Sequence, residues 1–97
     1  MTMHNPPHPG EFIRSVYLEP FGLSARALAE SLAVSPSTLN RVITGKSGVS
    51  PEMALRLSKA LGRTAESWLA MQDHYDLWQA KQNVQLGQVR HVEFVVA

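Results

Sequence analysis

The chain has 97 residues, 44% of them hydrophobic, and a formal net charge of +1, which is enough for one small folded domain with a short appendage. It has no cysteine, which excludes disulfides and thiolate chemistry and agrees with a reducing cytoplasm. No apolar run approaches the roughly 18 residues of a membrane span, and the first ten residues lack the apolar core of a secretory signal, so we expect a cytoplasmic protein.

The charges are unevenly distributed along the chain. Residues 1–63 hold seven Lys or Arg against four Asp or Glu, a balance of +3, and residues 64–97 hold two against four, a balance of −2. A basic front and an acidic back can orient a protein on DNA. Non-specific affinity should be poor for a single copy, because few phosphates are neutralised.

Residues 1–9 are predicted to form an extended arm, because three of them are prolines. The two histidines of this arm, His4 and His8, have no third ligand nearby in the sequence, so we expect no metal site. A first helix follows, which we expect to stop before Pro20. Its apolar residues recur at helical spacing: Phe12, Ile13, Val16 and Tyr17.

Two short helices joined by a turn are predicted between Leu23 and Lys46. Ser24 and Ser35 can each accept a hydrogen bond from a free N–H of a first helical turn, and Pro36 suits the first helical position. The first helix carries a narrow stripe of Ala27, Leu28, Ser31 and Leu32. The second buries Leu39, Val42 and Ile43. Helices with so short a link cross steeply, which leaves the polar side of the second helix exposed.

The polar side of this second helix has the composition of a DNA recognition surface. It consists of Ser37, Thr38, Asn40, Arg41 and Thr44, and Gly45 ends the helix. No acidic residue lies between Glu30 and Glu52. Hydroxyl, amide and guanidinium groups donate to base edges and phosphates, whereas carboxylates repel phosphate. An ordinary solvated face is the alternative, but such a face usually mixes Glu with Lys.

Residues 46–49 form a loop that is either close to a phosphate or an ordinary surface loop. A third capped helix is predicted to begin at Ser50, with Pro51 first and an acid in its first turn, and to end at Gly62. Its apolar stripe consists of Met53, Leu57, Ala60 and Leu61.

The next helix is predicted to begin after Thr64 and to end near residues 81–83. It places Trp68, Tyr75 and Trp78 on one face. Aromatic residues at helical spacing form a core or an interface far more often than a cofactor site.

The last stretch, residues 88–96, alternates with period two and predicts a strand. A single strand has no partner for its N–H and C=O groups, so it either frays, pairs with its own copy, or adds to another protein's sheet. We therefore divide the chain into an arm (1–9), a helical DNA-binding domain (10–82) and a C-terminal tail for dimerisation or partner binding (83–97).

The segment LSARALAESLAVSPSTLNRVITGK, residues 23–46, resembles the helix-turn-helix of the phage-repressor (Cro/C1, or XRE) class. The stretches HPGEFIRSVYLEPFGLS and GKSGVSPEMALRLSKALGRTAESWLAMQDHYDLWQAK are similar to the HigA antitoxin branch of that class. The resemblance implies an all-α, five-helix phage-repressor-like domain, here followed by the short C-terminal β-strand. It also implies a homodimer that binds its own operator and neutralises a HigB-like toxin, a RelE-like enzyme that cleaves mRNA.

The resemblance assigns roles to ten residues. By family position, the base-facing residues are Ser35, Pro36, Ser37, Asn40 and Arg41. The phosphate-facing residues are Ser24, Arg26, Thr38, Thr44 and Lys46. Two departures matter: the class often has glutamine where this chain has Ala25, and the turn glycine is replaced by Ala33, where a left-handed backbone costs roughly 1 kcal/mol.

Two further functions are compatible with the sequence. One is a helix-turn-helix transcriptional regulator without a toxin partner, and the other is a protein-interaction module that no longer binds DNA. An enzyme is not expected, because the sequence has no cysteine, no metal-ligand spacing and no Ser-His-Asp set that can be placed on one surface. Neither a cofactor nor a membrane partner is expected.

Overall fold

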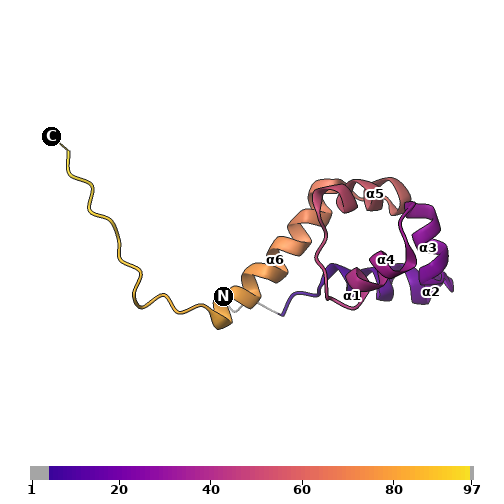
Figure 1. Ribbon diagram of the computed structural model, residues 1–97, viewed down its shortest axis with the longest axis horizontal. Helices are drawn as coiled ribbons and strands as arrows, with labels where there is room; N and C mark the ends of the chain where they lie inside the picture. The colour runs from indigo at the N-terminus through magenta and orange to yellow at the C-terminus, as the bar shows by residue number, and fades with distance from the viewer. Residues whose placement is uncertain (1–4, 97) are drawn as a thin grey trace.

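The computed structural model describes residues 5–96, and it is built of helices joined by short turns (Figure 1). The first helix is continuous but has three segments: α1 (Pro9–Ile13), the π-helical η1 (Arg14–Leu18) and α2 (Glu19–Phe21). Four more helices follow: α3 (Ala25–Leu32), α4 (Pro36–Ile43), α5 (Pro51–Leu61) and α6 (Ala65–Asn83). The predicted five-helix, all-α fold is confirmed.

The first helix does not stop before Pro20, and that prediction is wrong. The N–H of Glu19 donates to the Arg14 carbonyl oxygen five residues earlier, which is the wider turn of a π-helix. Pro20 has no N–H, and the widened turn lets the helix pass through it. The helix ends instead at Gly22, whose φ of 62° is left-handed.

The predicted caps are present at the helices that follow. The hydroxyls of Ser24, Ser35, Ser50 and Thr64 accept from the N–H three residues later, at 3.0 to 3.1 Å. Three residues predicted on apolar faces are exposed: Val16 of the first helix, Ser31 of α3 and Ala60 of α5. In α3 and α5, Ala29 and Ala54 are fully buried instead. These alanines let neighbouring helices pack closely.

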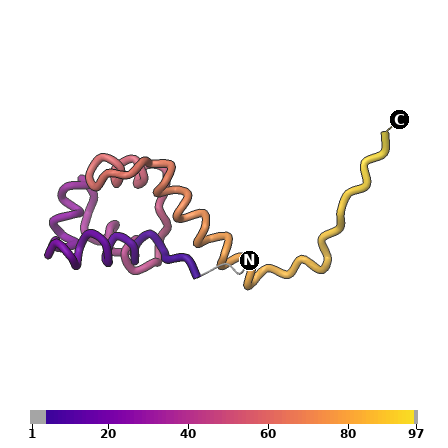
Figure 2. The backbone as a smooth tube through the Cα atoms, turned by 180° about the vertical axis from the view of Figure 1, so that it is seen from behind, coloured from indigo at the N-terminus to yellow at the C-terminus, as the bar shows by residue number. Residues whose placement is uncertain are grey.

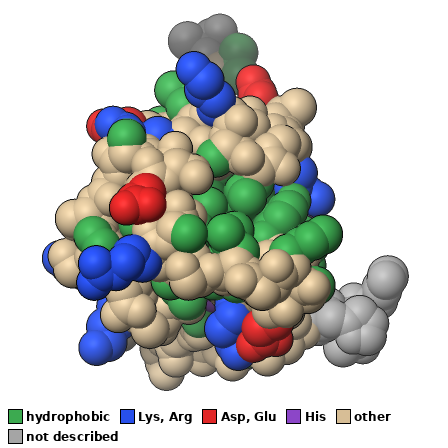
Figure 3. Space-filling model, turned by 90° about the vertical axis from the view of Figure 1, so that its right-hand side faces the viewer, with side chains coloured by type: hydrophobic (Ala, Val, Ile, Leu, Met, Phe, Trp, Pro, Cys, Tyr) green, Lys and Arg blue, Asp and Glu red, His purple; other side chains and the backbone are tan. Residues whose placement is uncertain are grey.

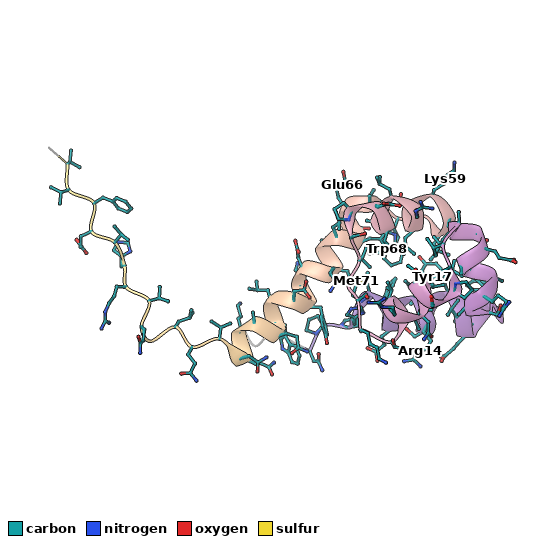
Figure 4. The ribbon with its side chains drawn as sticks, in the orientation of Figure 1. Arg14, Tyr17, Lys59, Glu66, Trp68 and Met71 are labelled. Carbon is teal, nitrogen blue, oxygen red and sulfur yellow. The ribbon has the colours of Figure 1, made fainter. Side chains whose placement is uncertain are left out.

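The core lies inside the ring of helices and is centred on Trp68 of α6, which has no exposed surface. Its indole N–H donates to the Gly62 carbonyl oxygen at 3.1 Å, and the Phe12 ring packs edge-on at 5.9 Å between centroids. Figure 4 shows Tyr17, Trp68 and Met71 pointing into this interior, while Lys59 and Glu66 point away. The predicted aromatic face of α6 is therefore partly core.

The second half of α6 and the tail extend away from the helical body (Figure 1). Residues 84–96 form no strand in the described chain, and every one of them is exposed. The strand predicted for residues 88–96 is thus not formed in the single chain, which offers no partner strand to its N–H and C=O groups. Among the described residues, no helix is both long and apolar enough to cross a bilayer.

The N-terminal segment lies along the outer half of α6 (Figure 2). His8 is buried, and its ring meets the Tyr75 ring edge-on with 5.0 Å between centroids. Pro9 already belongs to α1. Of the arm predicted for residues 1–9, only residues 5–8 lie outside the helix within the described chain, and His8 packs rather than extends into solvent.

Apolar side chains gather at the end of the molecule opposite the C-terminal tail, where α2 and α3 lie (Figure 3). An open groove of about 550 Å³ between α3 and α5 belongs to this end. Leu55 lines it and is 64% exposed, which agrees with its position away from the stripe of α5.

Candidate nucleic-acid interface

The polar face of α4 stands outward from the fold. Leu39 and Val42 are buried, and Ile43 is half-buried. All ten residues assigned to DNA binding are exposed or half-buried at the surface: Ser24, Arg26, Ser35, Pro36, Ser37, Thr38, Asn40, Arg41, Thr44 and Lys46. Eight of these ten lie on α4 or directly beside it, and Ser24 and Arg26 lie at the start of α3. The fold thus leaves each of these ten side chains accessible from solvent.

The side chains with most donor capacity are not occupied by other protein groups. Within residues 5–96, no hydrogen bond or ion pair engages the side chains of Asn40, Arg41, Arg26 or Lys46. Asn40 has an amide suited to adenine, and Arg41 has a guanidinium suited to guanine or phosphate. Both can therefore bind a ligand without first breaking an internal contact.

The hydroxyl groups on this surface differ in whether they can still donate a hydrogen bond to a ligand. Ser35 caps α4 by accepting from the Thr38 N–H, and its own hydroxyl donates to Thr38 Oγ1 at 2.8 Å. The Thr44 hydroxyl donates to the Asn40 carbonyl oxygen at 2.8 Å. Among the described residues, the Thr38 hydroxyl donates no hydrogen bond. Thr38 is therefore a better outward donor than Ser35 or Thr44.

The turn between α3 and α4 has the strain expected from the sequence. Ala33 has φ 59° and ψ 42°, the left-handed conformation that glycine adopts freely. Arg56 of α5 binds this turn by donating to the Leu32 carbonyl oxygen at 2.8 Å and to that of Ala33 at 3.3 Å. Arg56 also pairs with Glu52 at 2.9 Å. Sequence reasoning missed this contact and had no local signal for it, because 24 residues separate Arg56 from Leu32.

Gly10 sets the position of the C-terminal end of α4, and sequence reasoning missed this residue as well. A methyl group at Gly10 would overlap the Val42 carbonyl oxygen and lie 2.7 Å from Ile43 Cα. The obstructing atoms are backbone, which cannot move aside as a flexible side chain does. Glycine is required here because the backbones of α1 and α4 touch.

A shallow hollow of about 290 Å³ lies between α4 and the start of α5. It is lined by Thr38, Arg41, Val42, Ser47, Gly48, Ser50 and Met53. None of these lining residues is acidic, and three carry hydroxyls. The loop of residues 46–49, for which the sequence left two interpretations open, thus adjoins the candidate surface.

The histidine and carboxylate side chains of the described residues are not grouped as metal ligands. No group of three or more His, Asp or Glu side chains within residues 5–96 is placed to hold a metal ion. The His8 Nδ1 atom accepts from the Gly10 N–H at 2.9 Å and caps α1. His4, the other histidine of the arm, lies outside the described residues.

Comparison with known proteins agrees with this geometry. A family model described as "Helix-turn-helix" matches residues 16–69. "Virulence-associated protein I" of Dichelobacter nodosus is 50% identical over 78 residues, covering 80% of this chain and 72% of that protein. "Antitoxin HigA-1" of Vibrio cholerae is 37% identical over 84 residues, covering 87% of this chain and 79% of that protein.

Solved structures of "antitoxin GraA" share both fold and sequence with this chain. One has a TM-score of 0.87 at 40% identity and covers 93% of this chain and 100% of its own. Another, "antitoxin GraA in complex with its operator", has a TM-score of 0.78 at 40% identity and covers 100% of this chain and 98% of its own. The chain therefore belongs to the helix-turn-helix family of the Cro/C1 (XRE) type, in the branch that includes the HigA antitoxins.

Proposed function

We propose that the protein is the antitoxin of a type II toxin-antitoxin pair, which binds the operator of its own operon as a homodimer and represses it. The observation that carries the proposal is the outward, acid-free face of α4, with Asn40 and Arg41 exposed and without internal partners among the described residues. A relative that aligns with the entire chain, "antitoxin GraA in complex with its operator", supports operator binding as the function.

In the proposed complex, α4 of each protomer enters a major groove. Asn40 and Arg41 contact base edges together with Ser35, Pro36 and Ser37, whereas Ser24, Arg26, Thr38, Thr44 and Lys46 contact phosphates. Pro36 contributes only an apolar contact, since its side chain has no donor. Two half-sites would lie about 34–36 Å apart, one turn of the duplex.

The homodimer is proposed from the surfaces that the single chain leaves uncovered. The outer half of α6 carries Leu77, 52% exposed, and is followed by a tail in which Phe94 is 83% exposed. A protein of this size gains much stability from burying such groups in a dimer. Paired antiparallel across a two-fold axis, two copies of residues 88–96 would satisfy the inner hydrogen-bonding groups of both strands.

The relatives named as antitoxins support a toxin partner for this chain. From the resemblance to the HigA branch, that partner would be a HigB-like, RelE-like ribonuclease that cleaves mRNA. The test is co-expression with the product of the adjacent gene, followed by pull-down and by gel shifts on the upstream DNA. Capture of a small basic protein together with a specific shift supports the proposal, since an enzyme that cleaves RNA needs positive charge to attract its anionic substrate. A specific shift without any captured partner would instead indicate a regulator that acts alone.

A further inference from the structure

Gln72 of α6 is a buried amide whose two ends are both bonded. Gln72 is 7% exposed. Oε1 accepts from the Val49 N–H at 2.8 Å, and Nε2 donates to Asp76 Oδ1 at 2.9 Å. Because Val49 is itself 5% exposed, its N–H has little access to water. The amide of Gln72 is thus the only described partner of that buried donor.

The loop held by Gln72 is the one that leaves the recognition helix α4. At its beginning, the N–H groups of Lys46 and Ser47 both donate to the Arg41 carbonyl oxygen, at 2.8 and 2.9 Å. At its end, the loop is fixed by the Val49 bond to Gln72. Lys46, a proposed phosphate contact, therefore lies in a short segment that is fixed on both sides.

Gly48 makes the approach of the amide possible. A Cβ at this position would lie 3.0 Å from Gln72 Cδ and 3.1 Å from Nε2. Such contacts are tighter than ordinary van der Waals distances, so a side chain here would require the Gln72 amide to shift by a few tenths of an ångström. The close approach of Gly48 and the Val49 bond point to the same conclusion: the loop is fitted to Gln72.

We propose that Gln72 is a positioning residue for DNA binding. It holds the loop of residues 46–49 in the position from which Lys46 reaches a phosphate. This inference rests on the proposed operator binding. Gln72 itself would not touch DNA, because it is buried beneath the loop. It would act through the Val49 N–H, and it thereby ties the helix that carries the candidate dimer surface to the DNA-contacting surface.

A merely structural role for Gln72 predicts a different result from a positioning role. A lower stability alone would reduce the fraction of folded protein and leave the salt dependence of binding unchanged. Displacement of Lys46 leaves one phosphate without its cation, and the slope of log affinity against log salt falls by about one for each phosphate that is no longer neutralised. The salt slope therefore separates the two roles.

The experiment compares Gln72→Met with wild type on the upstream operator DNA. Methionine has a similar length but cannot accept from Val49. We expect about tenfold weaker binding at fixed salt, comparable to the removal of a phosphate contact, and a slope reduced by about one per half-site. In the Lys46→Ala background, Gln72→Met should weaken binding further by less than about twofold, because the contact it positions is already absent.

Gln79→Met is the matched control. Gln79 lies on the same helix, and its amide donates to the Tyr75 hydroxyl at 2.9 Å and not to the loop of residues 46–49. This variant should retain wild-type affinity and salt slope. A second test is Gln72→Glu combined with Asp76→Asn, which reverses the donor and acceptor between the two side chains and keeps an acceptor for Val49. This pair should restore affinity to within about threefold of wild type.

The outcomes are distinct. Wild-type affinity and slope for Gln72→Met, with wild-type protein binding specifically, would overturn the inference alone. A decrease in affinity that is additive with Lys46→Ala at an unchanged slope would also overturn it, since that result indicates a structural role. Wild-type protein that binds no upstream DNA would overturn the proposed function, and this inference with it. If Gln72→Met does not fold, the exchange pair decides: its failure to bind despite a wild-type melting curve overturns the inference.

Discussion

Arg56 Nη1 lies 2.8 Å from the carbonyl oxygen of Leu32, the last residue of α3, and donates a hydrogen bond to it. The C-terminal carbonyls of a helix lack partners within the helix and carry partial negative charge. A guanidinium at this position supplies both a hydrogen-bond donor and a positive charge. The contact joins α5 to the turn that sets the angle between α3 and α4. A residue outside the two-helix unit thus holds the turn that orients α4.

Arg56→Met should lower the free energy of unfolding by about 1 kcal/mol, since it removes a charge-assisted hydrogen bond from a partly exposed site. Urea unfolding followed by circular dichroism measures this change. Glu52→Gln is the control, because it removes only the exposed ion pair and should cost less than about 0.5 kcal/mol. If the two variants were destabilised equally, the contact with the turn would have no role of its own.

Ala33→Gly should stabilise the protein by up to about 1 kcal/mol, because glycine adopts the left-handed conformation at φ 59° without strain. Ala27→Gly, a change inside α3, should destabilise it by about the same amount. Thermal unfolding of both variants gives the signs of the two changes. A lower stability at both positions would contradict the assignment of strain to Ala33.

Gly10→Ala should destabilise the protein by about 2 kcal/mol or more, because the added methyl group meets the backbone of α4 and cannot be accommodated by a change of rotamer. Operator affinity should fall as well, since α4 must shift. Gly87→Ala, at a position with nothing within 4 Å, should behave as wild type. Normal stability of Gly10→Ala would show that α1 and α4 separate easily.

The local features of the fold could be read from the sequence. Ser24, Ser35, Ser50 and Thr64 mark the starts of four helices, because a cap depends on residues within one turn. The outward face of α4 was predicted for the same reason: helical periodicity places Leu39 and Val42 opposite Asn40 and Arg41.

The features that sequence reasoning missed depend on contacts between residues distant in sequence. Val49 and Gln72 are 23 residues apart, and the pairing of Gly10 with α4 depends on how two helices cross. No local pattern encodes either contact. The strand predicted for residues 88–96 has the required alternation, but a strand forms only when a second strand pairs with it.

The stability of the fold should depend on pH through His8. Burial lowers the pKa of His8 below its ordinary value of 6.5, against the opposing carboxylates of Asp76 and Glu11. The unfolded chain then binds the proton more readily than the folded one, so stability is full above pH 6.5 and decreases as the pH falls below it. A proton on Nδ1 would also break the cap to Gly10.

His8→Asn keeps a capping side chain but cannot titrate, so it should flatten the pH dependence of the unfolding midpoint below pH 6.5. His91→Asn, in the exposed tail, should leave the wild-type dependence in place. An identical pH profile for His8→Asn and wild type would show that His8 does not govern this dependence.

The most direct test of the central claim, that the outward face of α4 reads DNA, is the operator affinity of Asn40→Ala and Arg41→Ala, measured by fluorescence anisotropy on the upstream DNA and on a scrambled duplex. Each substitution should cost roughly 1–3 kcal/mol on the operator and much less on the scrambled duplex, at unchanged melting temperature. Wild-type affinity and specificity in the double variant would contradict the assignment of α4 as the recognition helix.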